Sequence, residues 1–314
     1  MEPIIKWTGS KRSQCKTIVD KFPKEINTYY EPFIGSAAVL FELLQRCEKS
    51  EIYCKKFICS DINEELIGTW DLIKDKPNYI LVQYKELYSE FSNLDIQGKK
   101  DFYNDIKYKF NELKLNREYS DYYYLLFFWL RRTCFNGLVR YNSKGEFNAP
   151  CHFTRNGIIP AKLESVIFEW STLLNKYNVQ FVCRDYKDFC IFNNDDLLYL
   201  DPPYANTYGM YQEGSFNKSE FYKWVNTLPR YILSYDGKRN ENDYTQNIED
   251  MITFNEHLYL NSGKSSFSKF INYLLCIMYF FNLFSILITI KNNLFFCIMS
   301  CVLFYQFFWI VFAI

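Results

Sequence analysis

The chain contains several short apolar runs that each lead to an acidic side chain, a pattern that predicts the buried strands of a parallel sheet. The clearest run covers residues 197–200 (LLYL) and is followed by Asp201, Pro202, Pro203 and Tyr204. Because proline cannot extend a sheet ladder, we expect the backbone to leave the sheet in a stiff turn directly after Asp201. Ligands of open α/β sheets bind at this end of the strands.

The predicted turn holds a carboxylate, a main-chain carbonyl and an aromatic ring in a fixed relation. Asp201 and the carbonyl of Pro202 offer two acceptors for the N–H groups of an exocyclic amine, and Tyr204 offers a flat face on which the ring bearing that amine can stack. The alternative interpretation is that these four residues only end a strand.

Further strand-end acids accompany this turn. Residues 29–44 predict a strand, a turn of small residues and an amphipathic helix, which is the opening unit of a nucleotide-binding α/β fold. A second strand ends at Asp61, from where a carboxylate reaches ribose hydroxyls, and another strand precedes Asp185. The alternative for Asp61 is that it caps a helix beginning at Glu64. The pattern G-x-G-x-x-G is absent, which disfavours pyrophosphate and favours a smaller nucleoside ligand.

The middle of the chain changes character. Residues 65–124 carry Lys, Glu, Tyr and Leu at helical spacing and predict a helical insertion with solvated, charged faces. Residues 130–150 then place cations among Phe, Tyr, Asn and Gly, with a hairpin turn expected at residues 143–145. Cations bind phosphates or a guanine edge, Asn binds base edges and an apolar side chain can wedge at a base step. Nucleic-acid-binding chemistry is therefore concentrated in this segment.

The last part of the chain is strongly apolar. Residues 271–290 and 294–314 contain no charged side chain and are joined by Lys291, Asn292 and Asn293. Each run is long enough to cross a bilayer core of about 30 Å. The two interpretations are a membrane hairpin of two helices and a reading frame that continues past the end of a soluble protein. We expect membrane association only through residues 271–314.

Composition narrows the class of partner. The chain has 36 Lys+Arg and 36 Asp+Glu, so its neutral total argues against a purely electrostatic nucleic-acid binder and leaves room for a local basic groove. Its 11 Cys lack a paired C-x-x-C, and there are two His, so we expect no metal site. The absence of a signal peptide at the start predicts reduced thiols in an intracellular, cytoplasmic protein.

The motifs and their order resemble the Dam-type, D12-class DNA adenine-N6 methyltransferases of the alpha motif order. The matching segments are KWTGSK at residues 6–11, EPFIGSAAVLF at 31–41, RTCFNGLVRYNSKGEFN at 132–148 and DPPY at 201–204. The resemblance spans roughly residues 4–269. It implies an α/β protein with a Rossmann-like methyltransferase sheet, S-adenosylmethionine as methyl donor and double-stranded DNA as partner of a monomer.

The resemblance also implies a domain organisation. Residues 1–64 and 157–270 are expected to form the catalytic domain, and residues 65–156 a mainly helical target-recognition insertion with its DNA-contacting hairpin. The implied reaction transfers a methyl group to N6 of a flipped-out adenine, in GATC or a closely related site.

Site residues follow by position from the resemblance. The expected catalytic residues are Asp201, Pro202, Pro203 and Tyr204. Donor binding is expected from Trp7, Gly9, Lys11, Phe33, Gly35, Asp61, Asp185 and Asp201. DNA contacts are expected from Arg132, Asn136, Leu138, Arg140, Tyr141 and Lys144.

This chain departs from the family pattern at a few places. Ser10 stands where the family usually has a second glycine, and Ser36 and Ala37 replace glycines of the EPFIGSAAVLF motif. Tyr235 stands where relatives often carry Asn. The alternatives to an active DNA enzyme are an inactive or membrane-tethered DNA-binding remnant, and a protein-glutamine methyltransferase, whose related motif is N-P-P-Y.

Overall fold

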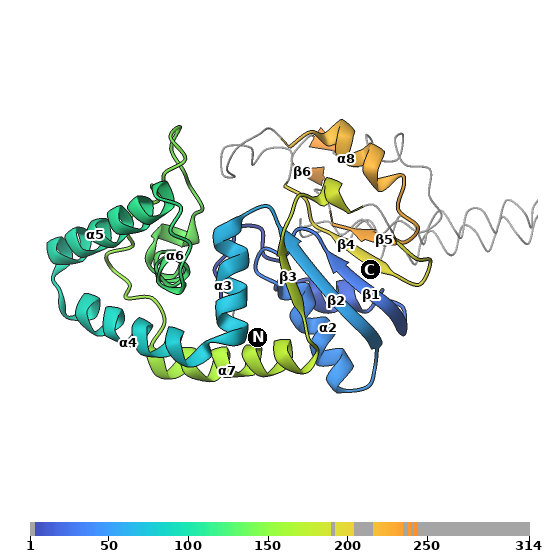
Figure 1. Cartoon of the computed structure of the whole chain (residues 1–314), viewed down its shortest axis with the longest axis horizontal. Coiled ribbons are helices and arrows are strands. Elements are labelled where there is room, and N and C mark those ends of the chain that lie inside the picture. The colour runs from blue at the N-terminus through green and yellow to red at the C-terminus, as the bar shows by residue number, and fades with distance from the viewer. Residues whose placement is uncertain (1–3, 190–191, 204–215, 235–237, 240–241, 244–314) are drawn as a thin grey trace, which may run out of the picture. The chain divides into compact units, whose positions relative to one another are not determined.

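The chain folds around a five-stranded sheet in which every strand runs parallel to its neighbours (Figure 1). The computed structural model describes residues 4–189, 192–203, 216–234, 238–239 and 242–243. The strands are β1 (Glu25–Glu31), β2 (Tyr53–Asp61), β3 (Gln180–Cys183), β4 (Leu197–Leu200) and β5 (Tyr231–Leu233). Their order, β3-β2-β1-β4-β5, confirms the predicted α/β fold and places β1 at the point where the strand order reverses.

Each strand of the sheet centre is buried on both faces. On β4, Leu197 and Tyr199 pack into one hydrophobic cluster, whereas Leu198 and Leu200 pack into the other. This explains why the sequence of β4 is continuously apolar rather than alternating, because a parallel sheet covered on both sides has no solvent-facing positions. The register of β1 and β2 runs from Glu25 opposite Tyr53 to Glu31 opposite Cys59.

Helices cover the sheet and build the insertion. They are α1 (Cys15–Val19), α2 (Ala38–Glu48), α3 (Glu64–Asp75), α4 (Pro77–Asn93), α5 (Ile96–Leu115), α6 (Asp121–Thr133), α7 (Pro160–Lys176) and α8 (Lys218–Val225). Two 3₁₀ turns, η1 (Phe135–Gly137) and η2 (Tyr186–Asp188), and a short pair of strands, β6 (Lys238–Arg239) and β7 (Asn242–Asp243), complete the described elements. The predicted helical character of residues 65–124 is confirmed.

The insertion shares its hydrophobic core with the sheet. Figure 1 shows α4, α5 and α6 grouped beside the sheet, with α3 and α7 leading to them. On α3, Trp70 stacks on Phe181 of β3 at 5.8 Å between ring centroids and lies 4.8 Å from Trp170 of α7. The predicted boundary after residue 64 therefore falls at the first turn of a helix that itself packs on the sheet.

Hydrogen bonds tie α3 to α7, the two helices that flank α4, α5 and α6 in the chain. The carbonyl of Lys74, in the last turn of α3, accepts from the hydroxyl of Ser171 at 2.7 Å and from the side-chain amide of Asn175 at 2.8 Å, both on α7. These side chains satisfy a carbonyl that the end of a helix leaves without an intrahelical partner. The end of α3 and the end of α7 are thus held together.

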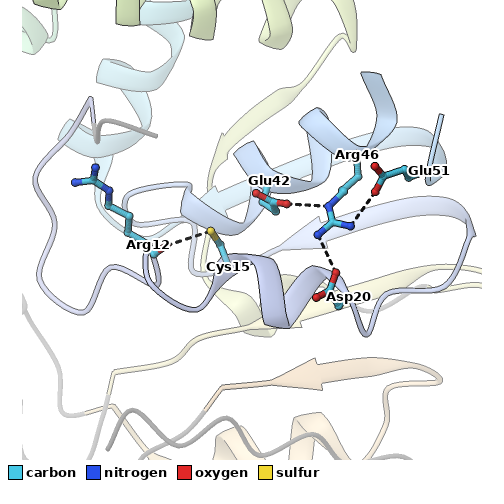
Figure 2. A network of polar contacts seen from close by, with 6 residues as sticks. All are labelled: Arg12, Cys15, Asp20, Glu42, Arg46 and Glu51. Atoms are coloured by element: carbon cyan, nitrogen blue, oxygen red, sulfur yellow. Dashed lines mark hydrogen bonds and ion pairs between the residues drawn. The ribbon is translucent and has the colours of Figure 1, made fainter. Parts of the chain in front are cut away.

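A polar network fastens α1 to α2. The guanidinium of Arg46 donates to the carboxylates of Asp20, Glu42 and Glu51, each at 2.8 Å (Figure 2). The thiol of Cys15, at the start of α1, donates to the carbonyl of Arg12 at 3.3 Å. Because α1 directly follows the KWTGSK segment, these contacts fix where that segment leaves the sheet edge.

The start of β4 is pinned to β1 by a buried acid. Asp196 is 1% exposed, and its carboxylate accepts from the side-chain amide of Asn27 at 2.8 Å and from the main-chain amides of Thr28 at 3.0 Å and Asn193 at 2.8 Å. These three donors explain how a carboxyl group is accommodated in the core, and they set how far β4 extends toward the sheet edge.

In the part of the chain that the structure describes, no helix is both long and apolar enough to cross a bilayer. The apolar tail, residues 271–314, lies outside the described residues, so the two interpretations of that tail stay predictions.

We predict that Asp196→Ala lowers the free energy of unfolding by about 2–4 kcal/mol, because it leaves buried donors of β1 without their acceptor. Urea unfolding followed by circular dichroism measures the change. Asp188→Ala, which removes an exposed acid, is the matched control and should change stability by no more than about 0.5 kcal/mol. Equal stability of the two variants would contradict the assigned role of Asp196.

Candidate active site

A cleft of about 270 Å³ opens at the carboxyl-end edge of the sheet. Its lining includes all eight residues predicted to bind the donor and two of the residues predicted to be catalytic, Pro202 and Pro203, besides Asp201. The donor residues are Trp7, Gly9, Lys11, Phe33, Gly35, Asp61, Asp185 and Asp201. The structure thus brings together side chains that lie far apart in the sequence. Tyr204 lies outside the described residues.

The sheet itself explains this convergence. β2 ends at Asp61, β3 ends two residues before Asp185, and β4 ends one residue before Asp201. Parallel strands present their carboxyl ends at the same edge, so an acid that follows each strand reaches the same cleft. The KWTGSK segment then closes the cleft through Trp7 and Lys11.

Asp61 faces the cleft and does not cap the following helix. Its carboxylate accepts from the amides of Gly35 at 3.4 Å and Asn63 at 3.1 Å. The cap of α3 is Asn63, whose side chain accepts from the amide of Leu66 at 2.7 Å. Burial raises the pKa of Asp61 to about 6, and the amide donors of Asn63 and Gly35 act in the opposite direction.

Asp201, the predicted catalytic acid, is held by a cation. Nζ of Lys11 lies 2.6 Å from Oδ1 of Asp201, with side chains 7% and 18% exposed, and the same ammonium donates to the carbonyl of Gly9 at 3.0 Å. Lys11 therefore touches the DPPY turn directly. The sequence predicted Lys11 as a donor-binding residue, and its ion pair with Asp201 was not foreseen.

Glu31, at the end of β1, is a site residue that the sequence reasoning missed. It lines the cleft, is 2% exposed and accepts from the hydroxyl of Tyr29 at 2.8 Å. Burial raises the pKa of Glu31 well above its usual range, the negative charge of Asp201 adds to the rise, and the bond from Tyr29 opposes it. The signal that identifies it was present, because Glu31 is also an acid at a strand end.

Aromatic rings form one wall of the cleft. The ring of Phe33 lies 5.5 Å from that of Tyr186 and 5.9 Å from that of Phe221, and Phe216 also lines the cleft. Tyr186 lies in η2, whose cap is Asp185; the carboxylate of Asp185 accepts from the amide of Lys187 at 3.0 Å. Tyr186 was not predicted from the sequence.

Two of the residues that depart from the family pattern, Ser10 and Ser36, contact each other. The hydroxyl of Ser36 donates to that of Ser10 at 2.7 Å, so the two serines that stand in place of glycines join the KWTGSK and EPFIGSAAVLF motifs. Ala37, the third replacement, has a left-handed backbone with φ of 53°, a conformation that glycine adopts more readily. The backbone path that glycine favours is thus kept despite the substitutions.

Gly35 permits a close approach to Trp7. Its φ is 46°, and a Cβ built there would lie 2.9 Å from Cδ1 of the Trp7 ring. Gly9 also has a left-handed backbone, with φ of 82°, but a Cβ there meets nothing within 4 Å. Glycine is therefore required at Gly35 for both backbone conformation and space, and at Gly9 for conformation alone.

The predicted hairpin is present, and several of the residues predicted to contact DNA are exposed to solvent. Tyr141 pairs with Phe147 in an antiparallel bridge around the turn at residues 143–145. Asn136, Arg140 and Lys144 are exposed, and Leu138 is half-buried. Nε of Arg140 donates to Oδ1 of Asn148 at 2.7 Å, which holds its guanidinium across the hairpin.

The structure places Arg132 and Tyr141 differently from the DNA contacts expected of them. Arg132 is 4% exposed and donates to the carbonyl of Ile4 at 3.2 Å, so it holds the N-terminal segment. Tyr141 is half-buried: its ring packs edge-on against Phe147, with Nζ of Lys114 4.4 Å from its centroid. Both residues face protein because they lie at the base of the loop, which the sequence alone does not reveal.

Among the described residues, no group of three or more His, Cys, Asp or Glu side chains is placed to hold a metal ion.

Comparison with known proteins identifies the family. The family described as D12 class N6 adenine-specific DNA methyltransferase matches residues 7–269. The type II methyltransferase M.MjaIII of Methanocaldococcus jannaschii is 34% identical over 235 residues, which cover 70% of this chain and 76% of that protein. The DNA adenine methylase of Haemophilus influenzae is 30% identical over 205 residues, covering 65% and 64%. The type II methyltransferase M1.LlaDCHI of Lactococcus lactis is 30% identical over 207 residues, covering 65% and 66%.

The chain belongs to the D12 class N6 adenine-specific DNA methyltransferases. It is accordingly an adenine-specific DNA methyltransferase.

We predict that Gly35→Ala weakens donor binding roughly 10- to 100-fold, because the new Cβ combines backbone strain with a collision against Trp7. Isothermal titration calorimetry measures the change. Gly9→Ala is the matched control, since it adds strain without a collision, and it should weaken binding less. An equal loss in both variants would show that the approach of Trp7 to Gly35 does not matter.

We predict that donor affinity falls as the pH decreases through about 6, by up to about tenfold for each pH unit below it. The sign follows from the raised pKa of Asp61: below about 6 the carboxylate is protonated and loses acceptor capacity. A titration of donor affinity from pH 5 to 8 tests this. Asp61→Asn should bind weakly at every pH, and an unchanged pH dependence in that variant assigns the effect to another group.

Proposed function

We propose that this enzyme transfers the methyl group of S-adenosylmethionine to N6 of an adenine flipped out of double-stranded DNA. The contact that carries the proposal is the ion pair between Lys11 and Asp201, because it joins the donor-binding segment to the acid of the DPPY turn within one cleft. Residues 1–64 and 157–270 are proposed as the catalytic part, and residues 65–156 as the target-recognition insertion.

The residues of the cleft fit this donor. Asp61 is an acceptor for ribose hydroxyls and Asp185 for an adenine amine, while the rings of Phe33 and Tyr186 offer faces for a purine or a sulfonium cation. When bound, the donor supplies an electrophilic methyl group on a positively charged sulfur.

The residues of the DPPY turn activate the amine. The lone pair of adenine N6 is delocalised into the ring, so the nitrogen is a poor nucleophile. Acceptors at Asp201 and the Pro202 carbonyl draw the N–H groups out of the ring plane and return electron density to nitrogen, and Tyr204 stacks on the base. In-line placement of N6 against the methyl group supplies much of the acceleration. The extra proton on nitrogen after transfer leaves through the acceptor Asp201.

Lys11 prepares Asp201 for this role. The ammonium of Lys11, 2.6 Å from the carboxylate of Asp201, stabilises the negative charge of that carboxylate and orients it.

DNA engages the recognition hairpin. N6 cannot be reached for this chemistry inside a duplex, so the target nucleotide has to leave the stack. Asn136, Leu138 and Arg140 are proposed to contact bases and Lys144 a phosphate, with GATC or a close relative as the site. The exposure of Asn136, Arg140 and Lys144 supports this assignment.

Two alternatives fit less well. A protein-glutamine methyltransferase needs neither the acid at Asp201 nor exposed cations on a hairpin. A remnant that binds DNA without turnover is disfavoured by the bond between Ser36 and Ser10 and by the preserved backbone at Ala37, because both keep the donor-binding turns in place.

The proposed activity and site are tested together by incubating the full chain with S-adenosylmethionine and DNA from a methylation-free host. Protection from a nuclease that cuts only unmethylated GATC supports both parts of the proposal. Tritium transfer to adenine without that protection keeps the reaction and assigns another site. No transfer to DNA, with transfer to protein, overturns the proposal.

We predict that Asp201→Ala lowers turnover by at least about 10³-fold while DNA affinity changes less than about threefold, because Asp201 acts on the amine and not on the duplex. Single-turnover tritium transfer and fluorescence anisotropy measure the two quantities. Asp188→Ala, an exposed acid in η2, is the control and should turn over normally. Undiminished turnover of Asp201→Ala removes this residue from the mechanism.

A further inference from the structure

Arg131, in the last turn of α6, is a fully buried arginine, 0% exposed, that the proposed reaction does not use. Its guanidinium donates to two main-chain carbonyls from different parts of the chain. One belongs to Gly137, at the start of the recognition loop, at 2.7 Å, and the other to Lys6, in the segment that closes the donor cleft. A single side chain thus bridges the two functional segments.

The two segments also touch each other directly. A Cβ built on Gly137 would lie 2.9 Å from Cβ of Lys6, and the φ of Gly137 is 65°. The recognition loop therefore turns tightly against the N-terminal segment, at a glycine that has no space for a side chain. Displacement of one segment requires displacement of the other.

The contact continues to the donor cleft through one ring. The guanidinium of Arg131 lies 5.0 Å from the centroid of the Trp7 ring. That ring lines the cleft and packs against Gly35, where an added Cβ would meet it at 2.9 Å. The path from the hairpin to the donor thus runs over Gly137, Arg131, Trp7 and Gly35, each in contact with the next.

We propose that Arg131 is a positioning residue that couples the two binding events, so that donor and DNA each raise the affinity of the other. The inference rests on the donor and DNA assignments of the proposed function. When the donor fixes Trp7, it fixes Arg131, and Arg131 then holds the start of the hairpin in one position. By thermodynamic linkage, DNA bound to the hairpin raises donor affinity by the same factor.

The chemistry of arginine suits this role. One nitrogen of its guanidinium donates to both carbonyls while the planar face of the group stacks on the Trp7 ring, whereas lysine offers a compact charge on a flexible stem and no planar face. Arg131→Lys therefore keeps the charge and loses the simultaneous contacts with Lys6, Gly137 and Trp7. A structural role alone would be served by either residue as long as the chain stays folded.

The test measures a coupling factor rather than activity. Affinity for S-adenosylhomocysteine, the product that carries no transferable methyl group, is determined with and without a saturating GATC duplex. DNA affinity is determined with and without that product. We expect a factor of at least about five in the wild type, the same from both sides, and about one in Arg131→Lys.

Arg132→Lys is the matched control, because Arg132 is also buried and adjacent, and its guanidinium donates to the carbonyl of Ile4. It should keep the coupling. If Arg131→Lys proves unfolded by circular dichroism, Gly137→Ala disturbs the same junction from the loop side and should lower the factor to about one.

The outcomes separate this inference from the proposed function. Failure of the wild type to bind product or duplex overturns the proposed function. Binding of both with a coupling factor of one in the wild type overturns the role of Arg131 alone. A folded Arg131→Lys variant that retains the wild-type factor, or an equal loss in Arg132→Lys, also overturns it.

Discussion

Parallel strand pairing is the constraint on which the rest of this structure depends. Because β1 lies between β2 and β4 and all strands run in one direction, the residues that follow them meet at a single edge. Glu31, Asp61 and Asp201 become neighbours for this reason and not through any local contact. Antiparallel pairing of β4 would send its strand-end acid to the opposite edge of the sheet. The buried carboxylate of Asp196 holds the start of β4 on β1 and thereby helps to place Asp201 at the cleft.

Concentrating carboxyl groups in one cleft carries an electrostatic cost that the structure offsets in different ways. Asp61 is bonded by two main-chain amides, Asp201 by the ammonium of Lys11, and Glu31 by the hydroxyl of Tyr29. The pKa values of Asp61 and Glu31 remain raised by burial, which shows that the compensation is partial.

The sheet and most of the cleft could be predicted because their signals are local. The apolar run before Asp201 predicts a strand, and the two prolines after it predict the turn that places Asp201 at the edge of the sheet. Asp61 and Asp185 are likewise acids at or just after the end of a strand. Glu31 carried that signal and was overlooked. Side-chain direction was less predictable: Arg132 lies among residues that resemble a DNA-binding loop, yet tertiary contacts turn it toward Ile4. Likewise, the pairing of Ser10 with Ser36 depends on the meeting of two turns.

The bonds from Ser171 and Asn175 to Lys74 have a consequence for how such enzymes can be modified. They hold the end of α3 against α7, the helices before and after α4, α5 and α6, so these two helices can stay together when the segment between them is changed. A recognition module from another source could be grafted between these helices without opening the sheet. On the proposed role of Arg131, such a graft would also have to bring a guanidinium for the carbonyl of Lys6, so that DNA binding and donor binding stay coupled.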